Sequence, residues 1–502
     1  MINLITLEKR SYIILAGLLL IFEVILICKG QWNGDFFEHS AVVNELSKNL
    51  FHPQNPIISS NTAHAFFSPY AVLVAAFSIV TGFDSIASLA CFAVFNLILF
   101  LCSLYFFSKS IFQKKQGLIA SLILIFTLIF WGTSPLSWSG FYHIFFLNYV
   151  LPYPSTFALS LTLFVLGFVS KKNYTYYPII ILFSTMVLIT HPPTAATLFV
   201  GTFSLCLCLN NYSLKQCIIK SSLLIFPAIL LSMLWPYFNI LHLFIGNEGA
   251  VDFNSSSAVL YTNVLKKNWP LLLAIPSVLY AKKDTTVVFL ALTTILLIAV
   301  FTAGYLFDFY GVSRTISAAM LFAHMLIAYT VVVQLDKLKY ANKNYLILIL
   351  LALVVSISMN FFRLGRVVFS VFKEKDIEYY HKFSFLKSEV SSNAIILSDN
   401  KSSWIIPTYH GKVISSSCAD DCKHPLHWVG NYKERRADVD TFFKKETPNS
   451  IRLKILKNYQ PDYILINYSN VEVSPSTHKW LKSLGETIYE QNNLELLKIH
   501  EK

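Results

Sequence analysis

Long apolar runs recur through the first 372 residues and constrain the fold more than any other feature of the sequence. Charged residues or Gly/Pro clusters separate these runs, which fall at residues 12–28, 85–107, 117–131, 155–170, 177–190, 193–209, 221–244, 269–281, 285–303, 316–335 and 344–360. A chain that is 55% hydrophobic and only 14% charged is too apolar for a soluble protein. The runs predict a multi-pass α-helical membrane protein with about eleven transmembrane helices. Several runs are shorter than the roughly 20 residues that a straight span needs, so the ends of the helices are not fixed by the runs alone.

Basic residues mark alternate short loops between these runs. They are Lys9, Arg10, Lys109, Lys114, Lys115, Lys171, Lys172, Lys215, Lys220, Lys282, Lys283, Lys337, Lys339 and Lys343. The positive-inside rule places such loops in the cytoplasm. We therefore expect a cell-membrane protein with a cytoplasmic N-terminus and an extracytoplasmic chain after residue 361, if residues 66–83 do not cross the bilayer. The net charge of +12 then reflects topology, and no nucleic-acid partner is expected.

The composition changes after residue 372. Residues 373–502 hold 19 of the 40 Lys and Arg residues, as in an ordinary soluble domain. Short β-rich runs at 394–398, 404–407, 412–415 and 463–466 alternate with helical patterns at 434–445 and 450–458. The sequence thus predicts a polytopic domain at 1–372 and a small extracytoplasmic α/β accessory domain at 373–502.

Two cysteines lie close together in this C-terminal domain. Cys418 and Cys422 can form a local disulfide. They can also bind a metal together with His424 and His427, but the spacing fits no common zinc pattern, which favours the disulfide.

Acidic residues gather in the first outer loop. Asp35 precedes a stretch in which Val42, Val43, Leu46 and Leu50 recur at helical spacing, which predicts an amphipathic helix on the membrane surface. Asp35, Glu38 and His39 then lie within one turn and can converge on one point. A carboxylate there can accept a proton from an acceptor hydroxyl. Asp35 and Glu38 also fit a capping box, which the spacing alone favours.

Several short motifs resemble a known family. They are Gly34-Asp35-Phe36-Phe37-Glu38-His39, the Pro53 and Pro56 segment, Ser68-Pro69-Tyr70, Thr81-Gly82-Phe83, His191-Pro192-Pro193-Thr194 and Tyr310-Gly311-Val312-Ser313-Arg314. The first four are similar to the first outer loop of the GT-C superfamily, integral-membrane glycosyltransferases that use polyprenyl-phosphate-linked sugars. The last two match such proteins in outline, so the resemblance covers most of the chain.

The resemblance implies an inverting transfer of a sugar from a polyprenyl-phosphate donor to an extracytoplasmic glycan, lipid or protein acceptor. It makes Asp35 the candidate base, with Glu38 and His39 beside it. The family more often carries Asp-Asp, Asp-x-Asp or Asp-Glu pairs. The wider spacing between Asp35 and Glu38 in this sequence departs from that pattern and leaves the role of Glu38 open. No cofactor is assigned from the sequence, and a divalent cation is left open.

A departing lipid phosphate requires fixed positive charge. Arg314 directly precedes an apolar run, where its guanidinium can bind phosphate bidentately or can act as a snorkelling interfacial anchor. His191 can hydrogen-bond the donor phosphate. The His-Pro-Pro sequence is also typical of a turn that separates two adjacent helices, and this structural role is favoured over phosphate binding.

Other candidates lie in the remaining outer loops. Trp138, Tyr142 and His143 can stack on sugar rings, although interfacial aromatic belts are the commoner role. Asp308 can join the site or bind a cation.

Two alternative functions remain. A polysaccharide polymerase or ligase shares the topology but is expected to rely on Arg and His in one large outer loop. A lipid-linked glycan transporter or flippase is expected to show internal symmetry and charged groups in mid-membrane. The sequence offers only Glu23 in mid-span and no repeat, so a transferase is favoured.

Overall fold

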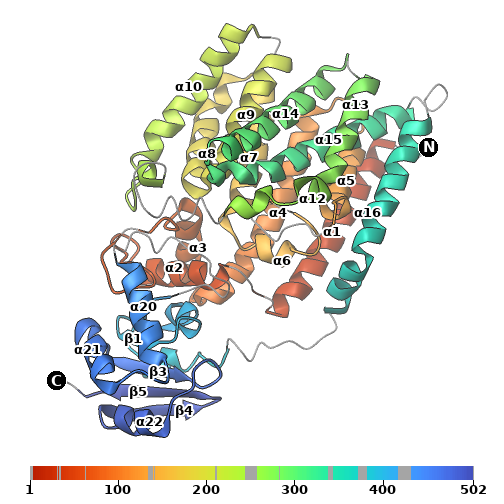
Figure 1. The fold of residues 1–502 in the computed structure, drawn as a ribbon. Helices are drawn as coiled ribbons and strands as arrows, with labels where there is room; N and C mark the ends of the chain where they lie inside the picture. The colour runs from red at the N-terminus through yellow and green to blue at the C-terminus, as the bar shows by residue number, and fades with distance from the viewer. Residues whose placement is uncertain are drawn as a thin grey trace. The chain divides into compact units, whose positions relative to one another are not determined.

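The computed structural model describes residues 4–500, apart from 31, 33–34, 63, 134–139, 141, 210–211, 244–256, 282, 337–342, 371–380 and 417–430 (Figure 1). The chain forms two compact units. The helical unit comprises Met1–Gln31, Ala90–Trp235 and Ser257–Glu374, and the mixed unit comprises Trp32–Leu89, Pro236–Ser256 and Lys375–Lys502. The predicted boundary after residue 372 stays a prediction, because the mixed unit also takes in the first outer loop.

The helical unit follows the predicted apolar runs closely. Its helices are α1 (Leu4–Cys28), α4 (Ser85–Ile111, which begins in the mixed unit), α5 (Gln116–Ile129), α6 (Leu147–Val150), α7 (Pro154–Ser170), α8 (Tyr177–Thr190), α9 (Pro192–Cys208), α10 (Leu214–Ser232), α12 (Val264–Asn268), α13 (Ala274–Ala281), α14 (Thr285–Leu306), α15 (Thr315–Asp336) and α16 (Lys343–Ser370). The multi-pass helical architecture is therefore confirmed.

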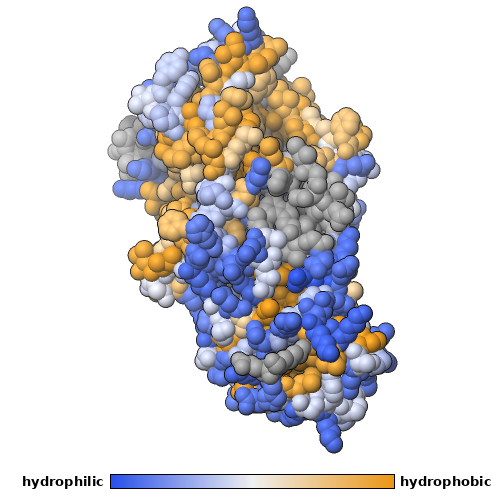
Figure 2. All heavy atoms as spheres, turned by 90° about the vertical axis from the view of Figure 1, so that its left-hand side faces the viewer, coloured by the Kyte–Doolittle hydropathy of each residue, from blue (hydrophilic) through white to orange (hydrophobic). Residues whose placement is uncertain are grey.

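Six helices in the described part of the chain are long and apolar enough to cross a membrane, and five apolar helices are shorter. In α15, 89% of the residues in its apolar stretch are buried inside the protein. In α1 and in α10, only 22% of the residues in the corresponding stretch are buried. α15 is therefore a central helix, and α1 and α10 present apolar side chains outward. Figure 2 shows hydrophobic side chains gathered over the upper part of the side of the molecule on which α10 lies. The count of about eleven spans stays a prediction.

One predicted span, 221–244, is wrong at both ends. The helix there, α10, begins seven residues earlier at Leu214 and ends at Ser232. Ser213 and Gln216 form a capping box that starts it, and Lys215 and Lys220, predicted to lie in a loop, belong to its first turns. Lysine is tolerated there because its long stem can carry the charge toward water.

The mixed unit contains α2 (Phe36–Lys48), α3 (Pro69–Thr81) and a five-stranded sheet. The strands are β1 (Ile395–Ser398), β2 (Lys412–Val413), β3 (Tyr463–Asn467), β4 (Gly485–Gln491) and β5 (Leu494–Ile499), in the order β2-β1-β3-β5-β4. β1 pairs in parallel with β2 and β3, and β5 pairs antiparallel with β3 and β4. α20 (Tyr432–Phe443), α21 (Asn449–Tyr459) and α22 (Pro475–Lys482) contribute to its apolar core, so the predicted α/β domain is confirmed.

Two details of this domain differ from the sequence prediction. The predicted strand at 404–407 is helical, in η6 (Ser402–Trp404) and α19 (Ile406–Tyr409). The Asp399 carboxylate accepts the N–H groups of Lys401 and Ser402 and starts this turn, overriding the local β propensity. The β4–β5 hairpin was not predicted. Its turn is Asn492 and Asn493, both with positive φ, as a two-residue hairpin turn requires.

The first outer loop packs directly against the sheet domain. The Asn44 amide donates to the backbone carbonyls of Pro407 and Tyr409, both at 3.1 Å. The Val413 N–H donates to the carbonyl of Ile57 at 2.8 Å. These contacts join the segment around α2 to the sheet domain within the mixed unit.

A buried ion pair reinforces this packing. The Lys412 ammonium lies 2.6 Å from a Glu45 carboxylate oxygen, with side-chain exposures of 3% and 6%, and also donates to the carbonyl of Asn55. Burial lowers the pKa of Lys412, and the opposing attraction of Glu45 does not fully offset it. The pair therefore specifies how the two segments fit more than it adds net stability.

Lys412→Met is expected to destabilise the mixed unit by about 3–5 kcal/mol, because it leaves the Glu45 carboxylate buried without its cation. Thermal unfolding of the purified full chain measures this. The double variant Glu45→Leu with Lys412→Met is expected to recover most of the loss, and Lys445→Met, which breaks the exposed pair with Glu472, to change nothing measurable. Equal losses in all three variants would contradict this interpretation of the pair.

Candidate active site

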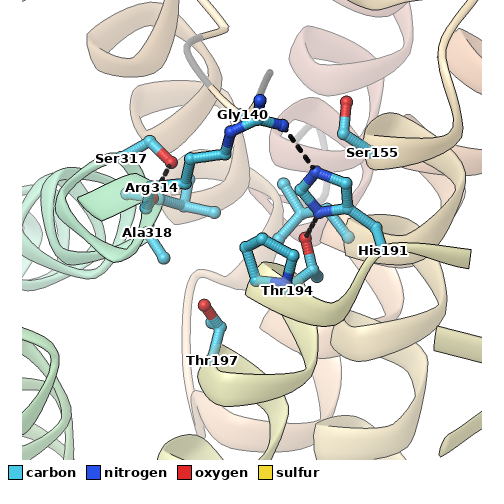
Figure 3. Close-up of a pocket in the computed structure, with 11 residues that line it drawn as sticks. Gly140, Ser155, His191, Thr194, Thr197, Arg314, Ser317 and Ala318 are labelled. Atoms are coloured by element: carbon cyan, nitrogen blue, oxygen red, sulfur yellow. Dashed lines mark hydrogen bonds between the residues drawn. The ribbon is translucent and has the colours of Figure 1, made fainter. Parts of the chain in front are cut away.

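Arg314 and His191 meet within the helical unit although 123 residues separate them. Arg314 ends the 3₁₀ helix η5 (Tyr310–Arg314), and its guanidinium donates to His191 Nε2 at 3.1 Å. His191 precedes α9, and its Nδ1 lies 2.7 Å from Thr194 Oγ1 (Figure 3). The three side chains thus form one hydrogen-bonded row.

The hydrogen-bond donors in this row determine the protonation state of His191. A guanidinium can only donate, so His191 Nε2 must accept and carry no proton. Nδ1 then holds the proton and donates to Thr194. His191 is therefore neutral, and the positive charge of the row belongs to Arg314.

The row lines a pocket with about 350 Å³ of space, including its open mouth. Gly140, Ser155, His191, Thr194, Arg314 and Ser317 contribute to its wall, and Figure 3 shows them around it. Arg314 is the one charged side chain among the described residues that line it. An arginine without a lining carboxylate makes the pocket a suitable place for an anion.

Gly140, which lies between α5 and α6, lets the chain there approach this pocket closely. Its φ is +92°, and a Cβ atom there would lie 2.6 Å from Ser317 Oγ. Ser317 in turn donates to the carbonyl of Arg314 at 2.7 Å. The backbone conformation thus favours glycine at this position, and a larger residue would also have to displace the Ser317 hydroxyl.

In the mixed unit, Asp35 occupies the N-cap position of α2 but makes no side-chain capping hydrogen bond. Its backbone carbonyl accepts the His39 N–H. The capping interpretation, which the spacing alone favours, is therefore wrong for the Asp35 side chain. The half-buried carboxylate stays a candidate base.

Glu38 lies beside a histidine that the sequence did not single out. His64 Nε2 is 3.3 Å from Glu38 Oε1, and both side chains are fully buried. His64 Nδ1 accepts the Phe66 N–H, so the proton of a neutral ring lies on Nε2 and faces the carboxylate. Glu38 thus lies beside a histidine, and since the Asp35 side chain makes no capping hydrogen bond, the two acids form no complete capping box.

α2 is not the surface helix that its apolar spacing predicts. Phe36 to Val43, Glu45 and Leu46 are all buried, and the helix packs against α3 and α19. The His39 ring stacks on Phe66, with centroids 4.3 Å apart. The polar residues of α2 are therefore enclosed by protein.

The remaining candidates lie elsewhere. Tyr142 is buried with its ring stacked on Phe100, and His143 is buried with Nδ1 accepting the Phe145 N–H. Asp308 is exposed in the turn after α14, where the Tyr310 hydroxyl donates to it at 2.6 Å. Trp138, Cys418, Cys422, His424 and His427 lie outside the described residues. Their predicted roles stay predictions.

Comparison with solved structures places this arrangement among known folds. ArnT from Cupriavidus metallidurans in the apo state matches with a TM-score of 0.53 and 11% identity, over 97% of this chain and 98% of that one. The Archaeoglobus fulgidus oligosaccharyltransferase, tethered with an acceptor peptide containing the NVT sequon, matches with a TM-score of 0.52 and 11% identity, over 92% and 69%. The chain has the GT-C fold. No family model and no curated protein matches this sequence.

Sequence patterns only partly indicate the polar residues that this GT-C fold brings together. Thr194 belongs to the His-Pro-Pro-Thr motif, and Ser317 follows Arg314 by one helical turn, so local spacing could have found both. His64 lies 26 residues from Glu38 without a motif of its own. Only the packing of the first outer loop reveals that pair.

Proposed function

We propose that this chain transfers a sugar from a polyprenyl-phosphate donor to an extracytoplasmic glycan, lipid or protein acceptor, with inversion at the anomeric carbon. The observation that carries the proposal is the Arg314–His191–Thr194 row, a fixed cation in a pocket whose described lining holds no carboxylate. The GT-C fold adds support, because the matched proteins include an oligosaccharyltransferase.

The proposed reaction is one displacement. The acceptor hydroxyl oxygen forms a bond to the anomeric carbon, and the bond from that carbon to the phosphate oxygen breaks. The phosphate leaves with the bonding electron pair, and the acceptor proton passes to Asp35. Arg314 stabilises the charge that develops on the leaving phosphate, which a guanidinium can bind through two parallel N–H groups.

The neighbouring residues have supporting roles in this proposal. His191 accepts from Arg314 and so limits the directions in which the guanidinium can point. Thr194 fixes the histidine ring through Nδ1. His64 lies beside Glu38, one helical turn from Asp35. Because a carboxylate accepts hydrogen bonds, Glu38 favours an acceptor that presents hydroxyl or amide donors.

Release of polyprenyl phosphate tests the proposal. The purified full chain, reconstituted with a panel of polyprenyl-phosphate sugars and a membrane extract as acceptor source, is expected to release polyprenyl phosphate from one donor only when acceptor is present. A flippase would move the donor across the bilayer and release none. Absence of release across the panel, with the donors intact, would overturn the proposal.

A further inference from the structure

A second pocket lies at the opposite ends of the helices that form the first. The Arg314 pocket takes Ser155 from the start of α7 and Thr194 from the start of α9. The second pocket takes Val169 from the end of α7 and Cys206 from the end of α9. α8 has 14 residues and runs between the two pockets, which separates them by about 20 Å. The second pocket therefore lies at the far ends of these helices from the Arg314 pocket.

Its polar wall is basic and rich in hydroxyl groups. We name it the tyrosine–lysine pocket, after Lys172, Tyr174, Tyr177, Tyr212 and Lys220. No acidic side chain is among the described residues that line it, and neither lysine forms an ion pair with a carboxylate in the described part of the chain. Among the described residues, these two positive charges have no carboxylate counter-ion at the pocket.

The contacts of Lys220 keep its ammonium at the pocket. It donates to the Tyr174 hydroxyl at 3.3 Å and lies 4.5 Å from the ring centroid of Tyr212. A cation over an aromatic face is held there by the ring quadrupole. An ammonium has three N–H donors, so Lys220 keeps a donor for a ligand beyond its contacts with Tyr174 and Tyr212, and the Tyr174 hydroxyl keeps its own proton to donate.

Lys172 occupies an unusual backbone position. It follows the C-terminus of α7 with a φ of +54°, in the left-handed region where glycine or asparagine is the usual residue. Its N–H donates to the carbonyl of Val169 at 3.2 Å. A lysine at such a position gives the pocket its second cation.

The other wall of the pocket is apolar. Phe168, Ile180 and Leu224 line it. On α10, which carries Lys220, the side chains of Ile219, Leu223 and Phe226 are exposed at 48%, 59% and 60%. They belong to the hydrophobic outer face of the helical unit, part of which Figure 2 shows. A ligand that suits this site has an anionic head and a long apolar tail.

We propose that the tyrosine–lysine pocket binds the phosphate head group of an anionic phospholipid in the leaflet opposite the Arg314 pocket. The lysines and tyrosine hydroxyls contact the phosphate oxygens, and the acyl chains lie along the apolar face of α10. The bound lipid joins the ends of α7, α8, α9 and α10. This proposal does not depend on the proposed sugar transfer.

Lipid binding to the purified full chain tests it. Phosphatidylglycerol is added to protein in neutral detergent, and binding is measured by native mass spectrometry together with the shift in unfolding temperature. We expect phosphatidylglycerol to bind and to raise the unfolding temperature, and phosphatidylcholine to bind more weakly. Lys172→Gln and Lys220→Gln are each expected to weaken phosphatidylglycerol binding about fivefold.

Lys215→Gln is the matched control, because Lys215 lies on α10 outside the pocket and is exposed. It is expected to leave binding unchanged, and all three variants to unfold at the wild-type temperature without added lipid. An equal loss with Lys215→Gln would show general attraction to net charge and overturn the site. Displacement of the lipid by millimolar inorganic phosphate would show a free-anion site and overturn the lipid assignment.

Discussion

Asp35→Asn is expected to reduce sugar transfer by about 10²–10⁴-fold, the usual contribution of a general base. The asparagine side chain has nearly the same shape but cannot accept the acceptor proton. Since the Asp35 side chain makes no capping hydrogen bond, the substitution removes no capping hydrogen bond from α2. Release of polyprenyl phosphate by the reconstituted variant measures the loss.

Asp84→Asn is the matched control for this variant. Asp84 is a carboxylate of the same unit, where it pairs with Lys387 at 2.8 Å and caps the start of α4. Burial raises its pKa, but hydrogen bonds from Ala87 and Lys387 outweigh this and hold the pKa below its usual range. Asp84→Asn keeps an oxygen that can accept the Ala87 N–H and is expected to keep near wild-type transfer. Near-normal transfer by Asp35→Asn, with normal unfolding, would contradict its role as base.

Arg314→Gln is expected to reduce transfer by about 10²–10³-fold, because it removes the charge that stabilises the leaving phosphate. Arg314→Lys separates this role from membrane anchoring. Lysine snorkels as well as arginine does, but it lacks the planar fork that contacts His191 and binds phosphate through two N–H groups. We therefore expect Arg314→Lys to lose most of the activity, and full activity in that variant would support the anchor instead.

The contact between Arg314 and His191 adds a second test. His191→Gln alone is expected to reduce transfer less than Arg314→Gln, because it only frees the guanidinium to adopt other directions. The double variant is expected to be no worse than Arg314→Gln, since residues in direct contact do not contribute independently. Additive losses would mean that the two residues act separately.

Hydrophobic periodicity predicts the helical body well, because each apolar run has to be helical inside a bilayer. Errors occur where local chemistry competes with the pattern. α10 extends past two lysines because Ser213 and Gln216 cap it, and residues 404–407 turn helical because Asp399 captures two N–H groups. Neither effect is visible in the spacing of apolar residues.

In the candidate sites, too, the sequence indicates single residues but not the contacts between them. Arg314 and His191 could be selected from their sequence context, and the fold brings them to 3.1 Å from each other. Their contact could not be predicted, because 123 residues and several helices separate them. The Glu38–His64 and Glu45–Lys412 contacts could likewise not be predicted from the sequence, since they depend on how the first outer loop packs in the mixed unit.

The anomeric configuration of the product tests the central claim most directly. NMR of the sugar linkage formed by the wild-type chain from a donor of known configuration gives this result in one experiment. A single displacement with Asp35 as base predicts a product whose configuration is opposite to that of the donor. A product of unchanged configuration would require a covalent intermediate or a second displacement, and would contradict the mechanism.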